Sequence, residues 1–104
     1  MGGARTEVGG ASEVVLKDSP SSPIVIGTIP LNACEGQMTF LKRTGGDTVY
    51  IKFKGGTPSP KNYDVILTDA LPFYTEDGIV IGDIKAIGTL ATSILSTYLS
   101  FKMS

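Results

Sequence analysis

The chain has 104 residues, of which 41% are hydrophobic, and its nine Lys and Arg against ten Asp and Glu leave a net charge of −1. This length suits a single domain, and the near-zero charge gives no field that would draw the chain onto nucleic acid or an anionic membrane. The sequence contains no His and no nucleotide-binding glycine motif. This excludes Ser-His-Asp catalysis, His-containing zinc sites and phosphate-binding loops, so we expect no enzymatic activity and no cofactor.

The N-terminal stretch MGGARTEVGG is rich in Gly and lacks the apolar region of a secretory signal, so no signal peptide is expected. Its composition predicts a flexible arm over residues 1–12, ahead of a single folded domain over 13–104. An arm of this kind becomes ordered by contact. The contact we expect is strand addition to the sheet edge of a neighbouring subunit, and packing against the chain's own domain or in a crystal stays open as the alternative. The residues predicted to take part in assembly are Arg5, Glu7, Val8, Val14 and Leu16.

Short runs with β-strand character alternate with turn clusters beyond the arm. The pair 37–43 and 48–54 is predicted to form a hairpin around TGGD, because glycines at 45 and 46 tolerate positive φ angles. A second turn is predicted at TEDG, residues 75–78. Residues 87–99 match helical as well as strand spacing, but Ser, Thr and aromatic content favours a strand over 94–103. The other expected strands are 13–17, 24–29, 63–68, 71–74 and 79–88.

Strands at this spacing predict an all-β fold, namely one small antiparallel β-sandwich of the jelly-roll-like or immunoglobulin-like kind. The longest uncharged run, 86–101, is too short and too rich in Ser and Thr for a membrane helix, so no membrane span is expected. Period-two spacing selects one face of each strand as the core face. The predicted core consists of Val49, Ile51, Phe53, Val65, Leu67, Ile79, Ile81, Leu99 and Phe101.

The opposite face of 48–54 carries Tyr50, Lys52 and Lys54. An aromatic ring beside two lysines resembles the surfaces that bind a small ligand or an oligonucleotide by stacking and phosphate contact. Lysines on the solvent face of a strand also keep a sheet edge from aggregating. The sequence pI near 5.2 favours the second interpretation, because nucleic-acid-binding domains are usually basic.

The segment GGTPSPKN after this strand contains no reactive side chain. Its glycines let the chain leave the strand and its prolines stiffen an extended path, so we expect a crossover at one end of the sandwich. The neighbouring carboxylates lack the order of a calcium-binding loop, and we interpret them as turn and surface residues. They are Asp64, Asp69, Glu76, Asp77 and Asp83.

The segment 48–88, TVYIKFKGGTPSPKNYDVILTDALPFYTEDGIVIGDIKAIG, resembles small β-sandwich accessory proteins of tailed phages. The likeness rests on a strand of the YIKF kind, a Ser/Pro loop, a run of the YDVIL kind and a closing IGDIKAIG. It implies a head-decoration, fibre or other minor structural role in the virion. It also implies a homo-oligomer attached to the major capsid or other virion proteins and assembled in the host cytoplasm.

Two alternatives remain open at this level. Similar sandwiches form bacterial surface filaments in which an extended N-terminal arm inserts into a neighbouring subunit. A monomeric binding module would instead use the face of Tyr50, Lys52 and Lys54. The measured mass in solution separates a multimer from a monomer.

Overall fold

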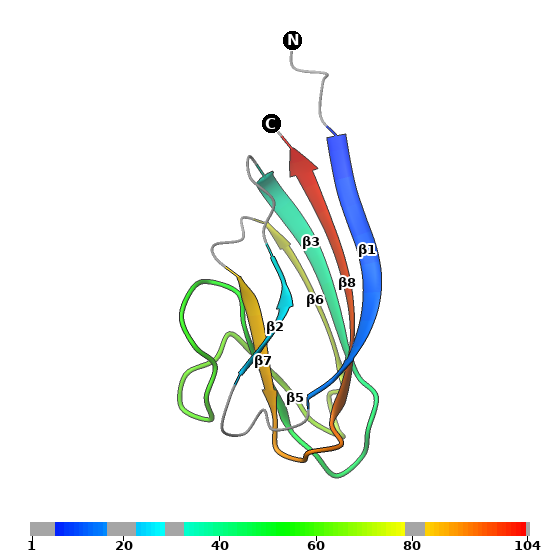
Figure 1. Ribbon diagram of the computed structural model, residues 1–104, viewed down its shortest axis with the longest axis vertical. Helices are drawn as coiled ribbons and strands as arrows, with labels where there is room; N and C mark the ends of the chain where they lie inside the picture. The colour runs from blue at the N-terminus through cyan, green and yellow to red at the C-terminus, as the bar shows by residue number, and fades with distance from the viewer. Residues whose placement is uncertain (1–5, 17–22, 29–32, 79–82, 104) are drawn as a thin grey trace.

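The computed structural model describes residues 6–16, 23–28, 33–78 and 83–103, and its regular structure is entirely β (Figure 1). None of these described segments contains a helix that is long and apolar enough to cross a membrane. The strand expected over 94–103 is confirmed. The strands are β1 Thr6–Val15, β2 Ile24–Gly27, β3 Ala33–Lys42, β4 Val49–Lys52, β5 Val65–Leu67, β6 Phe73–Gly78, β7 Ile84–Gly88 and β8 Ile94–Met103.

The strands form two four-stranded antiparallel sheets that face each other (Figure 1). One sheet, in the order β1-β8-β3-β6, has strands of six to ten residues and is called the long sheet. The other, in the order β2-β7-β4-β5, has strands of three to five residues and is called the short sheet. Eight strands in this arrangement form a jelly roll, so the predicted all-β sandwich is confirmed and the jelly-roll alternative is the correct one.

The core lies between the two sheets and follows the predicted alternation in β4. Phe53, directly after β4, packs its ring on Phe40 of the long sheet with centroids 6.4 Å apart and an interplanar angle of 26°. Leu99 is half-buried and packs against the core, and positions 79 and 81 lie outside the described residues. The predicted core residues that are buried are Val49, Ile51, Phe53, Val65, Leu67 and Phe101.

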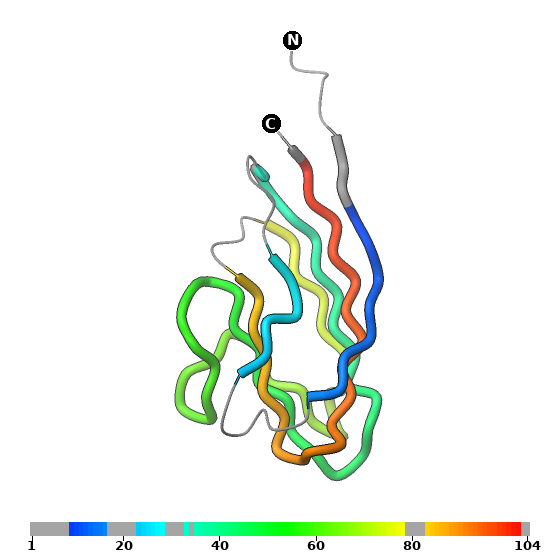
Figure 2. Tube along the Cα trace, in the orientation of Figure 1, coloured from blue at the N-terminus to red at the C-terminus, as the bar shows by residue number. Residues whose placement is uncertain are grey.

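The predicted hairpin between 37–43 and 48–54 is wrong, because β3 belongs to the long sheet and β4 to the short sheet. The loop between them carries the chain from one layer to the other (Figure 2). Phe40 and Ile51 are both fully buried in the same core, which places the apolar faces of the two strands opposite each other. Burying both faces requires two facing sheets, and this requirement overrides the local turn preference.

Residues 55–62, predicted as a crossover, instead join the adjacent strands β4 and β5 within the short sheet (Figure 2). Gly55 and Gly56 leave β4 with φ angles of 85° and 95°, a region that favours glycine. Ser59 and Asn62 then exchange backbone hydrogen bonds of 2.8 and 3.0 Å. The segment is therefore a wide hairpin loop rather than a connection between layers.

The turn predicted at 75–78 is also wrong, because these residues complete β6. The strand pairs with β3 from Phe73 opposite Leu41 to Gly78 opposite Gly36. Pairing with a long neighbouring strand supplies the backbone hydrogen bonds that a turn would otherwise make locally. Polar side chains are tolerated in β6 because it lies at the edge of the long sheet and is partly exposed.

Candidate assembly surfaces

The edge strand β1 is formed largely by residues that the sequence assigns to a flexible arm. It pairs with β8 without a register shift from Thr6 opposite Met103 to Val15 opposite Ile94. The predicted boundary at residue 12 therefore falls inside a strand, and residues 6–12 are part of the long sheet. This is a correction, since we expected the arm to contribute little to the domain's own fold. Glycines weaken a strand in isolation, so the ordering of this segment comes from its pairing with β8.

The residues predicted to mediate assembly separate into two groups. Residue 5 lies outside the described residues, while Glu7 and Val8 contribute backbone to β1 and pair with β8. Val14 packs against the core, and Leu16 is fully buried within it. The prediction that Leu16 anchors a neighbouring subunit is wrong, because its side chain, directly after β1, is part of the monomer's own core.

Within the described residues, β1 pairs with β8 alone, so its other edge presents unpaired backbone groups. A groove of about 300 Å³ lies beside this strand and is lined by Leu99 and Phe101 of β8. A Cβ built on Gly10 has no heavy atom within 4 Å, so a side chain is easily accommodated there. A long unpaired edge beside an apolar groove is the geometry that accepts an added strand. The remaining lining residues are Gly9, Ala11, Ser12 and Thr28.

The outer face of the long sheet is apolar at one end. Phe73 and Leu41 are cross-strand partners, and Tyr98 lies on the same face two strands away from β6. The side chain of Phe73 is 58% exposed and that of Tyr98 is 46% exposed. Together with Thr39 and Ala11 they line a shallow depression of about 460 Å³. Large exposed aromatic side chains grouped in this way are typical of protein contact surfaces.

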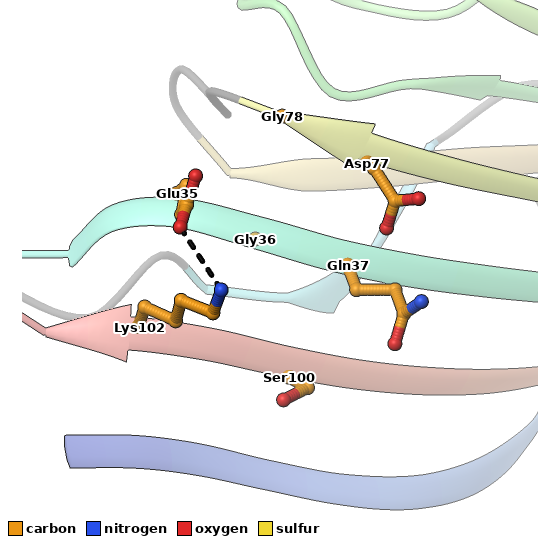
Figure 3. Close-up of a pocket in the computed structure, with 7 residues that line it drawn as sticks. All are labelled: Glu35, Gly36, Gln37, Asp77, Gly78, Ser100 and Lys102. Atoms are coloured by element: carbon orange, nitrogen blue, oxygen red, sulfur yellow. Dashed lines mark ion pairs between the residues drawn. The ribbon is translucent and has the colours of Figure 1, made fainter. Parts of the chain in front are cut away.

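The other end of the same face is polar (Figure 3). Lys102 forms an ion pair of 3.2 Å with Glu35, and the side chains of Gln37, Asp77 and Ser100 project from neighbouring strands around a hollow of about 230 Å³. No group of carboxylate, thiol or imidazole side chains in the described segments could hold a metal ion. The outer face therefore changes from apolar to charged along its length.

The predicted binding face of Tyr50, Lys52 and Lys54 is divided between several internal contacts. The Tyr50 ring packs at 5.3 Å from the ring of Tyr63, and Lys52 lies 3.5 Å from Asp64. The ammonium of Lys54 sits 5.7 Å from the centroid of the core ring of Phe53. Strand β4 lies between β7 and β5, so the interpretation of its lysines as edge protection is wrong.

Asp64, directly before β5, binds the backbone directly after β4 and so joins the two strands of the β4–β5 hairpin. Its Oδ2 accepts hydrogen bonds of 2.8 and 3.0 Å from the backbone N–H groups of Phe53 and Lys54. Burial alone would raise the pKa of Asp64, but these two hydrogen bonds and the charge of Lys52 outweigh it and hold the pKa below the ordinary 3.8. A carboxylate that the sequence assigns to surface or turn chemistry thus fixes the end of a strand.

This lowered pKa predicts a loss of stability in acid. The contribution of ionised Asp64 is fully present above the ordinary value of 3.8 and is lost as the pH falls from there through the lower pKa of the folded state. Urea unfolding followed from neutral pH to below 3.8 should show a shallower acid slope for Asp64→Asn than for the natural chain. Asp77→Asn, which removes an exposed carboxylate, should keep the full slope. An unchanged slope in Asp64→Asn contradicts the prediction.

A buried ion cluster lies at the end of β3. The Nζ of Lys42 is 2.9 Å from Oδ1 of Asp47 and 2.5 Å from Oδ1 of Asp69, and it also donates to the backbone carbonyl of Thr44. The side chains of Lys42 and Asp47 are 2% and 0% exposed, whereas that of Asp69 is 62% exposed. The hydroxyl of Thr44 donates to Asp47 at 2.7 Å. This cluster, called the Lys42 cluster below, fixes the loop that crosses between the sheets.

The charges of the Lys42 cluster stabilise one another. Burial alone would lower the pKa of Lys42, but hydrogen bonds to Asp69 and Asp47 raise it above its ordinary 10.5. Burial would likewise raise the pKa of Asp47, yet hydrogen bonds with Ser93, Thr44 and Lys42 lower it. The pKa of Asp69 is lowered chiefly by its hydrogen bond with Lys42. Asp69, interpreted from the sequence as a turn or surface residue, thus holds a buried lysine. Lys42 and Asp47 were not predicted as a site, although Lys42 follows Met38 and Phe40 in period two and so occupies an inward position.

No protein-family model matches the sequence, and no curated protein matches it. Among solved structures, the fold is similar to a chain from work on Bacillus endospore appendages, which are described as a novel family of disulfide-linked pili. The TM-score is 0.65 and the sequence identity 12%, and the match covers 96% of this chain and 88% of the other. At this identity the likeness shows a shared fold over nearly the whole length of both chains.

Proposed function

We propose that this protein is a non-enzymatic structural subunit that assembles with copies of itself. The observation that carries this proposal is the ten-residue edge of β1, unpaired on one side among the described residues and flanked by the groove over Leu99 and Phe101. Free β edges of this length promote association, and natural monomers usually protect them with bulges, prolines or inward-pointing charges. Strand β1 carries no proline and pairs with β8 in unbroken register.

The assembly in which such a subunit acts has two candidates. The segment 48–88 supports an accessory protein of a phage virion, as a capsid decoration or minor structural protein bound to the shell. The similarity in fold to an endospore appendage chain supports a bacterial surface filament as the second candidate. Both kinds of assembly use small β-sandwich subunits in contact with copies of themselves or with a larger lattice. The proposed contact through the β1 edge is compatible with either kind.

A charge placed on the β1 edge tests the proposal. We expect the natural chain to sediment as a multimer and Gly10→Lys to sediment as a monomer, because a lysine directed into the groove prevents a second strand from approaching. The Cβ of residue 10 has no neighbour within 4 Å, so the fold itself should tolerate this change. Sedimentation equilibrium over a range of protein concentrations measures the effect.

Gly45→Lys is the matched control, because Gly45 also has no heavy atom within 4 Å of a built Cβ and lies in the loop between β3 and β4. This variant adds the same charge away from β1 and should remain multimeric. A natural chain that stays monomeric at high concentration contradicts self-assembly. A multimer that persists in Gly10→Lys contradicts the β1 edge as the interface and directs attention to the outer face of the long sheet.

A further inference from the structure

The Lys42 cluster places a buried primary amine in contact with two carboxyl groups from different parts of the chain. Lys42 ends β3, Asp47 lies in the loop to β4, and Asp69 lies between β5 and β6. The Nζ of Lys42 is 2.5 Å from Asp69 and 2.9 Å from Asp47, and all three groups converge although Lys42 and Asp69 are 27 positions apart. Amide formation requires an amine in contact with a carboxyl group, and a second carboxyl group beside them can carry the proton.

We propose that Lys42 and Asp69 condense to an intramolecular isopeptide bond, with Asp47 as the proton carrier. The Nζ lone pair of neutral Lys42 attacks Cγ of protonated Asp69, forming the Nζ–Cγ bond and a tetrahedral centre. Asp47 takes a proton from the nitrogen and delivers it to the departing hydroxyl of Asp69, which leaves as water. One N–H bond and one C–O bond break, one C–N bond and one O–H bond form, and no oxidant or co-reactant is needed.

The surroundings of the two carboxyl groups assign their roles. Asp69 accepts hydrogen bonds of 3.2 and 3.0 Å on its two oxygens from the backbone N–H of Gly46, a donor that polarises the carbonyl and stabilises negative charge on the tetrahedral oxygen. Its exposure of 62% gives the departing water a path to solvent. Asp47 is fully buried beside the same Nζ, where it can receive and return a proton without exchange with solvent.

The reaction starts from a minor protonation state. The mutual stabilisation of charges in the cluster favours the ammonium and carboxylate forms, so the neutral amine and the carboxylic acid are populated only briefly. Groups held in contact compensate for a low population, since well-oriented intramolecular reactions behave as if one reactant were present at roughly 10⁵–10⁸ M. Condensation then removes the positive charge of Lys42 and the negative charge of Asp69, and the buried carboxylate of Asp47 accepts a hydrogen bond from the new amide N–H.

The intact mass of the purified protein, measured under denaturing conditions, tests the proposal. We expect a mass that is lower than the sequence mass by one water molecule, and a tryptic digest in which the peptides containing Lys42 and Asp69 remain joined. Lys42→Arg, which keeps the positive charge, and Asp69→Ala should each restore the full sequence mass. A natural chain with the full sequence mass overturns the proposal without requiring any variant to fold.

Asp77 followed by Gly78 could lose water through a cyclic imide, so the digest must separate the two modifications. Hydroxylamine cleaves a cyclic imide and leaves an isopeptide bond intact. Water loss that survives in Asp69→Ala, or that disappears after hydroxylamine treatment, overturns the assignment. Asp47→Ala keeps both bonding partners, and we expect it to retain a large fraction of uncrosslinked chain; complete cross-linking in this variant overturns the role given to Asp47. These outcomes do not depend on whether the protein assembles through β1.

Discussion

Replacing Phe53 by Ala is expected to lower the free energy of unfolding by about 3–5 kcal/mol. The Phe53 side chain is 1% exposed and packs on Phe40, which belongs to the opposite sheet. Truncation therefore leaves a cavity at the contact between the two layers, and the surrounding strands cannot close it without breaking their register. Urea denaturation at a protein concentration low enough to suppress association measures this effect.

Phe73→Ala provides the control for the same chemical change on the surface. The Phe73 ring is 58% exposed on the outer face of the long sheet, so its removal should change the free energy of unfolding by less than about 1 kcal/mol. An effect below about 1 kcal/mol for Phe53→Ala would show that its assignment to the core is wrong. Equal losses of unfolding free energy in the two variants would show that removing an aromatic ring costs as much on the surface as at the contact between the sheets.

In the Asp69→Ala background, where Lys42 cannot condense and stays an ammonium, Lys42→Met is expected to lower the free energy of unfolding by about 3–5 kcal/mol, because it leaves the carboxylate of Asp47 buried without its cationic partner. The Asp47 side chain has no exposed surface and lies 2.9 Å from the Nζ of Lys42. Methionine keeps most of the side-chain volume, so the loss reports the missing charge and hydrogen bonds rather than a cavity. Urea denaturation at neutral pH measures it.

Arg43→Ala is the matched control at the next position. The Arg43 side chain is 52% exposed and its nearest carboxylate oxygen, on Glu13, is 3.9 Å away, so its removal should cost no more than about 1 kcal/mol. If Lys42→Met were as mild as Arg43→Ala, the Lys42 cluster would have to be solvated in solution and would not fix the crossover loop. A double variant that also changes Asp47→Leu should regain part of the loss, because the uncompensated charge is then removed.

Much of the fold is predictable where the local pattern and the burial agree. Alternation in 48–54 identified the inward face of β4, and the Ser, Thr and aromatic content of 94–103 identified β8, because both strands have one face in the core. The sandwich class followed from the number and spacing of strand-like runs. These features depend on patterns within short stretches of the sequence, so they can be predicted from the sequence alone.

Sheet membership was not predictable from the same signals. Gly45 and Gly46 suit a tight hairpin as well as a crossover loop, and only the core decides between the two by requiring β3 and β4 on opposite sides. Residues 75–78 have turn composition but become a strand through pairing with β3. The glycine-rich start of β1 reads as an arm because the strand that orders it, β8, is at the other end of the chain.

The candidate surfaces were predictable only in part, because side-chain partners are set by the fold. Tyr50 and Lys52 do lie on the outer side of β4, but their contacts with Tyr63 and Asp64 come from the neighbouring hairpin strand. Lys42 carried a usable signal, since a lysine in phase with Met38 and Phe40 must be paired if it is buried. Its partners Asp47 and Asp69 could not be identified without the crossover that brings them together.

The position of β8 between β1 and β3 determines when the molecule can fold. Among the described strands β8 comes last in the sequence, yet it lies between β1 and β3 in the long sheet, and it pairs with β1 from Thr6 opposite Met103 onward. During synthesis β1 therefore has no partner among the described strands until β8 has been made, and the long sheet forms only after β8 has left the ribosomal exit tunnel. Pairings of such long sequence separation fold slowly, so the newly made chain passes through a period in which its apolar strands are exposed to other chains.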